Sequence, residues 1–162
     1  MRTHSECGAF VDHLRLEHRH LRDAVRGTVA AIEAWRRTSG HAERGEIVFD
    51  QLHLLRDQIV NHFHEEESGG CMEEAVSRCP SISLDAKAVE AEHPILHAEL
   101  ERIISRVKSL SLPAETVAAI ESDFREFAKR LSAHEAAENR ILRYGFGSEA
   151  ADADVDLECC DE

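Results

Sequence analysis

Histidine is the most unusual residue type in this chain, with 11 copies among 162 residues. In the pairs His62/Glu66, His93/His97 and His134/Glu138, a His is followed four positions later by a Glu or by another His. Because residues i and i+4 are neighbours on a helix surface, each pair could hold a cation between two side chains. Imidazole and carboxylate groups suit iron, manganese, cobalt and zinc. The spacing therefore predicts metal chemistry if these segments are helical.

Four long segments have apolar residues at helical spacing. They cover about residues 7–37, 42–68, 83–108 and 113–144. Short connections between long helices favour antiparallel neighbours, so the pattern predicts an all-α protein with an up-down-up-down four-helix bundle. Residues 69–82 contain Gly, Ser and Pro and are expected to form a loop over one end of that bundle.

The apolar stripes of all four helices continue into polar residues. In the second helix, apolar residues at positions 48, 52, 55 and 59 predict that positions 62 and 66 also face the core. The same extension in the other helices adds five further groups. The predicted inward-facing groups are His18, His62, Glu66, His93, His97, His134 and Glu138.

These seven groups fall at one level of an antiparallel bundle. They lie near the start of the first and third helices and near the end of the second and fourth. With a rise of ~1.5 Å per residue, all of them meet within about two turns. Left unpaired in a dry core, each group would be costly. Cations would satisfy them, and a set of this size needs two.

Four sequence motifs carry a family resemblance: EHRHLR around His18, HFHEEE around His62, HPILH from His93 and HEAAE from His134. Their order, spacing and helix placement resemble the hemerythrin-like, HHE cation-binding domain over roughly residues 8–145. The resemblance implies a four-helix bundle that holds two non-haem iron ions, bridged by carboxylates and by an oxo or hydroxo group. Manganese and zinc are possible alternatives to iron.

The resemblance also implies a role for each residue. One iron would be held by His93, His97 and His134 and the other by His18 and His62, while Glu66 and Glu138 would bridge both. One departure is visible, because blood-pigment hemerythrins place an Asp five residues after the last His, where this chain has Asn139. Glu138 looks like the bacterial and regulatory variants, which makes dedicated oxygen transport the less natural interpretation.

The number of ligands indicates where chemistry would occur. Two octahedral irons have about twelve positions, of which the imidazoles, the carboxylate oxygens and the bridging oxygen fill about eleven. The open position, on the two-His iron, would take dioxygen, peroxide or nitric oxide. We expect a di-iron protein that binds dioxygen or a related small ligand in sensing, storage or delivery, and we assign no catalytic residue.

Three other interpretations stay open. A di-iron oxidase, peroxidase or nitric-oxide-handling enzyme would use the same ligands, but no extra carboxylate or Tyr falls on the stripes near the site as a proton donor. Iron sensing or storage would couple metal binding to the order of the bundle. A structural bundle with zinc, or with no metal, would leave the cost of the buried polar groups unexplained.

Composition narrows the class of partners. A formal charge of −13 argues against nucleic acid and anionic membrane surfaces. No transmembrane-length apolar run or signal-peptide pattern is present, so a cytoplasmic location is expected. Five Cys residues without paired spacing are expected to be free thiols. We expect one domain over residues 1–147 and a disordered acidic tail over 148–162, and nothing in the pattern points to a protein partner.

Two carboxylates directly precede predicted ligands along the chain. Glu17 and Glu92 could accept a hydrogen bond from an imidazole N–H, although a solvent-facing position is the expectation for both. A solvated face is also expected for the histidines that fall off the stripes, which are His4, His13, His20, His41, His53 and His64.

Overall fold

Helices make up most of the described part of the chain. The computed structural model describes residues 4–39 and 41–147, so the predicted acidic tail lies outside the described residues. Within these ranges the chain forms no strand, and the all-α prediction is confirmed. The elements are α1 (His4–Arg37), α2 (Ala42–Gly69), α3 (Cys71–Arg78), the 3-10 turn η1 (Pro80–Ile82), α4 (Ser83–Val107) and α5 (Ala114–Phe146). None of the described helices combines the length and the apolar character needed to cross a membrane.

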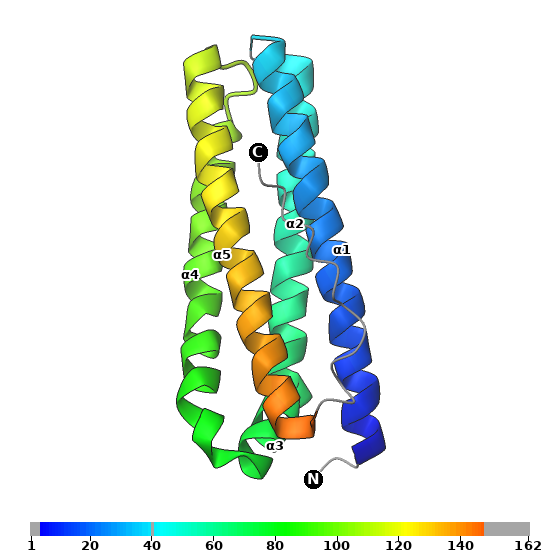
Figure 1. The fold of residues 1–162 in the computed structure, drawn as a ribbon. Coiled ribbons are helices and arrows are strands. Elements are labelled where there is room, and N and C mark those ends of the chain that lie inside the picture. The colour runs from blue at the N-terminus through cyan, green and yellow to red at the C-terminus, as the bar shows by residue number, and fades with distance from the viewer. Residues whose placement is uncertain (1–3, 40, 148–162) are drawn as a thin grey trace, which may run out of the picture.

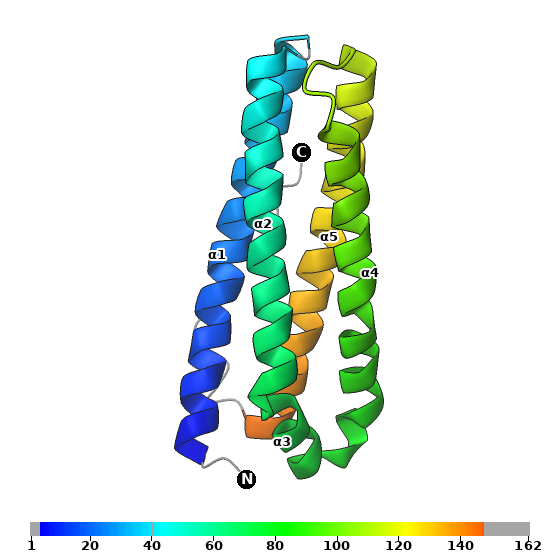
Figure 2. The same cartoon turned by 180° about the vertical axis from the view of Figure 1, so that it is seen from behind.

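The four long helices α1, α2, α4 and α5 lie side by side (Figure 1). Both α1 and α4 pack against α2 and α5. The turn from α1 to α2 and the connection from α4 to α5 lie at the same end of the molecule, and α3 lies at the opposite end (Figures 1 and 2). Consecutive long helices therefore run in opposite directions, and the ends predicted to carry the polar groups are brought together.

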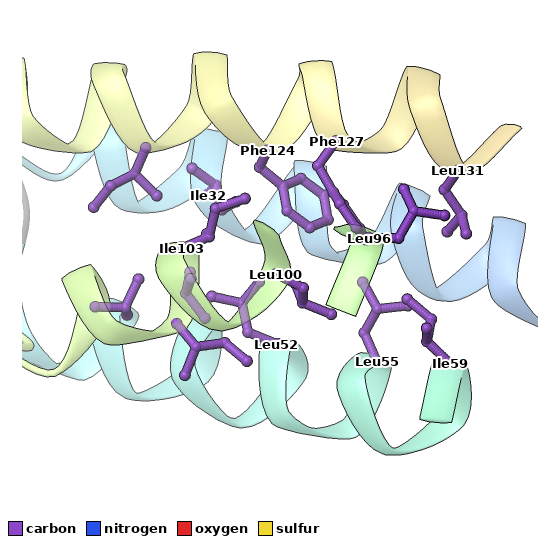
Figure 3. Packing of buried hydrophobic residues seen from close by; sticks show 14 of the residues in the cluster. Ile32, Leu52, Leu55, Ile59, Leu96, Leu100, Ile103, Phe124, Phe127 and Leu131 are labelled. Carbon is purple, nitrogen blue, oxygen red and sulfur yellow. The ribbon is translucent and has the colours of Figure 1, made fainter. Parts of the chain in front are cut away.

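An apolar core fills the space between the long helices. Its largest cluster includes Trp35 of α1, Leu52 of α2, Leu100 of α4 and Phe124 of α5, all of them fully buried. Figure 3 shows Phe124 projecting from α5 toward the side chains of α4 and α2. Burial of these side chains is the main favourable contribution to folding. It also fixes the rotation of each helix about its axis, and so the direction in which the polar end of each stripe points.

The segment over residues 69–82 contains a helix, which corrects the prediction of a loop. α2 ends where Gly70 takes a φ of 69°, a left-handed conformation that glycine adopts without a steric penalty. Acidic residues in the first turn of α3 and Arg78 in its last turn complement the helix dipole. α3 lies so close to α5 that a Cβ added to Gly145 would be 2.4 Å from the Cβ of Ala75.

Candidate metal centre

Six of the seven predicted ligand residues converge at the end of the molecule where α3 lies. Each belongs to the inward stripe of a long helix and is no more than 6% exposed. α1 supplies His18, α2 supplies His62 and Glu66, α4 supplies His93, and α5 supplies His134 and Glu138. All four imidazoles present Nε2 to the two carboxylates. The donor atoms form two groups.

The first group consists of His18 and His62 with one oxygen from each carboxylate. His18 Nε2 lies 3.2 Å from His62 Nε2 and 3.3 Å from Glu138 Oε2. His62 Nε2 lies 3.3 Å from Glu66 Oε1, which is the i+4 contact that the sequence predicts. Donor atoms from three helices therefore surround one point.

The second group consists of His93 and His134 with the remaining oxygen of each carboxylate. His93 Nε2 lies 3.4 Å from Glu66 Oε2 and 3.8 Å from Glu138 Oε1. His134 Nε2 lies 2.7 Å from Glu138 Oε1. Glu66 and Glu138 therefore each direct one oxygen to the first group and the other oxygen to the second.

The spacing of the donor atoms suits coordination of cations better than hydrogen bonding between these side chains. Nitrogen and oxygen ligands at ~2.0–2.2 Å from a common cation lie roughly 3–3.5 Å apart, which is close to the spacing within each group. Nε2 of His93 and of His134, and both oxygens of Glu66 and of Glu138, have no hydrogen-bond partner within the described part of the chain. An unsatisfied buried polar group costs about 1–3 kcal/mol. Each group of four residues could hold a metal ion.

Similarity to known proteins gives no further guidance on this site. Comparison of the chain with protein-family models, with curated proteins and with solved structures finds no match. The assignment of metal-binding capacity therefore rests on geometry. Two imidazoles and two carboxylate oxygens in each group form a mixed nitrogen and oxygen donor set that first-row divalent metals favour.

His97 is the predicted ligand that the structure does not bring to the centre. Its side chain is 44% exposed, and its Nε2 lies 3.8 Å from Glu101 Oε1 on the same helix. The inward position is taken by Leu96, which is 3% exposed. The buried stripe of α4 therefore steps from His93 to Leu96 and not to His97, and α4 continues as a helix through Pro94. Each donor group then has two imidazoles, and an octahedral cation would keep about two open positions in either group.

Three carboxylates accept hydrogen bonds from the Nδ1 atoms of ligand imidazoles, on the side of each ring that faces away from the centre. Glu17 accepts a hydrogen bond from Nδ1 of His62 at 3.1 Å, and Glu92 accepts one from Nδ1 of His134 at 2.9 Å. Glu67 accepts one from Nδ1 of His93 at 2.9 Å. With a cation bound, these bonds would keep the proton on Nδ1 and leave the Nε2 lone pair for the metal. Glu17 and Glu92 thus both reach an imidazole on the neighbouring helix. Glu92 is also solvent-facing as expected, with its side chain 50% exposed, whereas the side chain of Glu17 is only 22% exposed.

Replacing such a carboxylate should weaken metal binding without unfolding the protein. We expect Glu92→Gln to lower metal affinity by about 10- to 100-fold, because the amide no longer fixes the tautomer and orientation of the His134 ring. Calorimetric titration of the metal-free protein with Zn²⁺ measures the change. Glu115→Gln makes the same chemical change at an exposed position at the far end of α5, the helix that carries His134, and serves as the control. Equal affinities for the two variants would show that the outer hydrogen bond has no such role.

The two halves of the chain supply equivalent parts of the centre. In the first half, Glu17-His18 on α1 faces the His62-x-x-x-Glu66 motif on α2, and in the second half, Glu92-His93 on α4 faces the His134-x-x-x-Glu138 motif on α5. The residue after the second histidine differs between the halves. Phe63 stacks on the His93 ring at a centroid distance of 4.0 Å, whereas the corresponding residue of the other half is Glu135.

Glu135 is a buried carboxyl group that the sequence pattern did not reveal. It is 2% exposed, although it lies beside the predicted stripe positions of α5 and not on them. Burial raises its pKa to about 7, even though the guanidinium Nη1 of Arg22 lies 3.6 Å from its Oε2. The charge of His18 also acts on it and favours ionisation. A proton-holding group therefore lies at the level of the centre, next to the first donor group.

Glu135 should make the metal-free protein less stable as the pH rises. Its pKa is about 7 when folded and has the ordinary value of 4.5 when unfolded, so between these values the folded state binds more protons. The stability that it contributes is present below about pH 4.5 and is lost by about pH 7, a difference of up to about 3 kcal/mol. We expect Glu135→Gln to remove this decline, as measured by urea unfolding at a series of pH values. Parallel curves for the two proteins would contradict the prediction.

Burial and contacts with neighbouring charged groups raise the pKa values of Glu66 and His93 and lower that of Glu138. Burial and the nearby Glu138 raise the pKa of Glu66 well above its usual range. Burial also opposes ionisation of Glu138, but close contacts with His134 and His18 outweigh it and hold the pKa of Glu138 well below the usual range. Burial lowers the pKa of His93, yet contacts with Glu138 and Glu66 outweigh this and raise it to about 10. Cations would displace the protons held by Glu66 and His93.

A third group of donor atoms lies outside the centre. His13 Nε2 is 2.8 Å from Glu65 Oε2 and 3.7 Å from Glu17 Oε1, and the side chains of His13 and Glu65 are more than two-fifths exposed. Glu17 is therefore shared between this outer group and the hydrogen bond to His62. The exposed position of His13 agrees with the solvated face expected from the sequence.

Proposed function

We propose that this chain is a hemerythrin-like, HHE-type di-iron protein. The proposed fold is the up-down-up-down four-helix bundle of that family, with α3 added between its second and third long helices. The order of the four motifs supports the proposal, and so does their convergence at one end of four antiparallel helices. The proposed metal sites are His18 with His62 for one iron and His93 with His134 for the other, bridged by Glu66 and Glu138.

The observation that carries this proposal is the division of both carboxylates between two imidazole pairs. Glu66 Oε1 and Oε2 lie 3.3 and 3.4 Å from Nε2 atoms of different groups, and Glu138 is divided in the same way. A single cation would not need both oxygens of both carboxylates. Two bridged cations use every donor atom and leave none of them unpaired.

The proposed activity is reversible binding of dioxygen, or of peroxide or nitric oxide, for sensing, storage or delivery. A pair of iron ions would supply the redox-active, Lewis-acidic atoms to which such molecules bind. Ferritin-like di-iron sites use four Glu and two His ligands, whereas this centre has four imidazoles and two carboxylates. Neutral ligands stabilise high oxidation states less than anionic ligands do, which favours binding over oxidative turnover.

One observation favours an enzyme as the second candidate. The sequence pattern showed no additional carboxylate near the site, but Glu135 is buried at that level beside His134, with its Oε2 3.6 Å from the guanidinium Nη1 of Arg22. A carboxyl group at such a position could transfer a proton in an oxidase, a peroxidase or a nitric-oxide-handling enzyme. Turnover of peroxide with a reductant, lost in Glu135→Gln while iron content is retained, would establish this alternative.

Metal analysis and optical spectroscopy test the principal proposal together. Protein purified in air should contain about two irons per chain and show near-ultraviolet absorption from an oxo-bridged ferric pair. Stopped-flow mixing of the reduced protein with dioxygen should give a charge-transfer band that disappears on removal of the gas. Colourless protein with one zinc ion would refute the di-iron centre, and irreversible oxidation alone would refute reversible binding.

A further inference from the structure

A cavity of about 430 Å³ connects the second donor group with the surface. Glu66, His93 and Glu138 form its inner end, whereas His18 and His62 do not line it. The open position expected from the sequence is on the iron held by His18 and His62, yet the space that reaches the centre lies on the side of His93. A molecule entering here would meet the second group first.

The size of this cavity exceeds what a diatomic ligand needs. One water molecule occupies about 30 Å³ of liquid, an apolar cavity of about 150 Å³ accommodates benzene, and small-molecule pockets span about 300–1,000 Å³. At about 430 Å³, the space corresponds to a small organic molecule. α3 forms one wall of it, so the helix that the sequence did not predict is the element that creates this pocket.

The walls of the cavity are mainly apolar. Met72 and Val76 of α3 face Ala86 and Val89 of α4 across it. Val89 is buried, and the other three are partly buried. An apolar surface of this kind does not solvate a bare metal cation, but it does favour the hydrocarbon part of an organic molecule.

The mouth of the cavity carries acidic groups. Glu67, Glu73 and Glu90 are exposed lining residues, and Lys87 is the one exposed basic residue among the lining residues described. Since Glu67 already accepts the hydrogen bond from His93, Glu73 and Glu90 are the carboxylates available to a ligand at the rim. A carboxylate or phosphate ligand would be repelled here, and an ammonium group would be attracted.

We propose that this cavity binds a small organic amine. Its apolar body lies between α3 and α4, and its ammonium group lies at the rim with Glu73 and Glu90. The inner end of the body then points to the metal ion held by His93 and His134. Binding in the cavity depends only on the chain, whereas contact between the ligand and a metal ion rests on the proposed function.

Three aromatic probes of similar size and different charge test this proposal. Benzylamine, benzyl alcohol and benzoate are titrated into the metal-free and the zinc-loaded full-length protein. The chain has 2 methionines, Met1 and Met72, so ¹³C-methyl methionine reports binding at Met72 with little overlap. We expect a shift of the Met72 signal, with benzylamine binding roughly tenfold or more tightly than benzoate and benzyl alcohol between them.

Matched variants separate the cavity from the protein surface. Ala86→Trp fills the cavity and should abolish the Met72 shift, whereas Ala88→Trp, two residues further along α4 and exposed, should leave it unchanged. Glu73→Gln with Glu90→Gln should remove the preference for benzylamine even if Ala86→Trp disturbs folding. The proposal is overturned if benzoate binds as well as benzylamine, if Ala88→Trp acts like Ala86→Trp, or if only divalent cations shift Met72.

These outcomes are distinct from a failure of the di-iron proposal. Metal content is measured on the same samples without any probe. Protein that binds benzylamine but holds no metal ion pair would refute the di-iron centre and leave the cavity proposal standing. Protein that holds two metal ions but binds none of the probes would refute the cavity proposal and leave the proposed metal centre standing.

Discussion

The metal-free protein is expected to gain roughly 10 °C in melting temperature when it binds two divalent cations. Ligands that bind only the folded state stabilise it by ~4 kcal/mol at a free concentration 1,000-fold above Kd. Each kcal/mol raises the melting temperature of a chain of this size by ~2–4 °C. Cations would also satisfy the unpaired atoms of Glu66, Glu138, His93 and His134. Thermal unfolding followed by circular dichroism, with Fe²⁺ under anaerobic conditions, with Zn²⁺ or with chelator, measures the gain.

A variant that lacks one imidazole from each donor group is the control for this effect. His62→Leu with His134→Leu replaces two buried polar groups with buried apolar ones. The melting temperature of this variant should not respond to cations, and its circular dichroism in the presence of chelator checks that the helices persist without metal. A wild-type protein that melts at the same temperature with metal and with chelator would contradict the centre described above. An equal gain in the variant would place the bound cations elsewhere.

Substitution of His93 is expected to remove at least half of the bound metal, whereas substitution of His97 is expected to remove none. The two residues are four positions apart on α4, but His93 lies at the centre, and the side chain of His97 is 44% exposed. His93→Ala takes one of two imidazoles from the second group and leaves Glu66 and Glu138 with a weaker cation site. Inductively coupled plasma analysis of both variants, refolded or reconstituted with iron, gives the number of ions per chain.

His97→Ala is also the internal control for this comparison, because it makes the same chemical change on the same helix. Loss of metal in both variants would show that His97 approaches the centre when metal binds, as the family resemblance implies. Full metal content in His93→Ala would remove α4 from the ligand set.

The sequence predicted most of the centre because its ligands follow helical spacing. The pairs His62/Glu66 and His134/Glu138 continue apolar stripes by i+4 steps, and the structure places all four residues inside. His97 shows the limit of that extension. An α-helix has 3.6 residues per turn, so buried positions along one face alternate between steps of three and four residues. The step of three after His93 leads to Leu96.

Other features could not be read from periodicity. Glu67 and Glu135 lie directly beside stripe positions, and only the packing of neighbouring helices decides whether such residues face solvent or the centre. The partners of Glu17 and Glu92 are on other helices, so no local pattern identifies them. α3 is too short for a measurable repeat, and its position against α5 depends on the close approach at Gly145.

The sharing of Glu66 and Glu138 between two donor groups has a consequence for how the centre fills. An ion bound in one group would orient both carboxylates, and their free oxygens would then complete a preformed site for the next ion. The first binding event bears the cost of ordering, and the second does not. Uptake should therefore be cooperative, with a sigmoidal titration in which vacant and doubly occupied chains coexist and singly occupied chains are scarce.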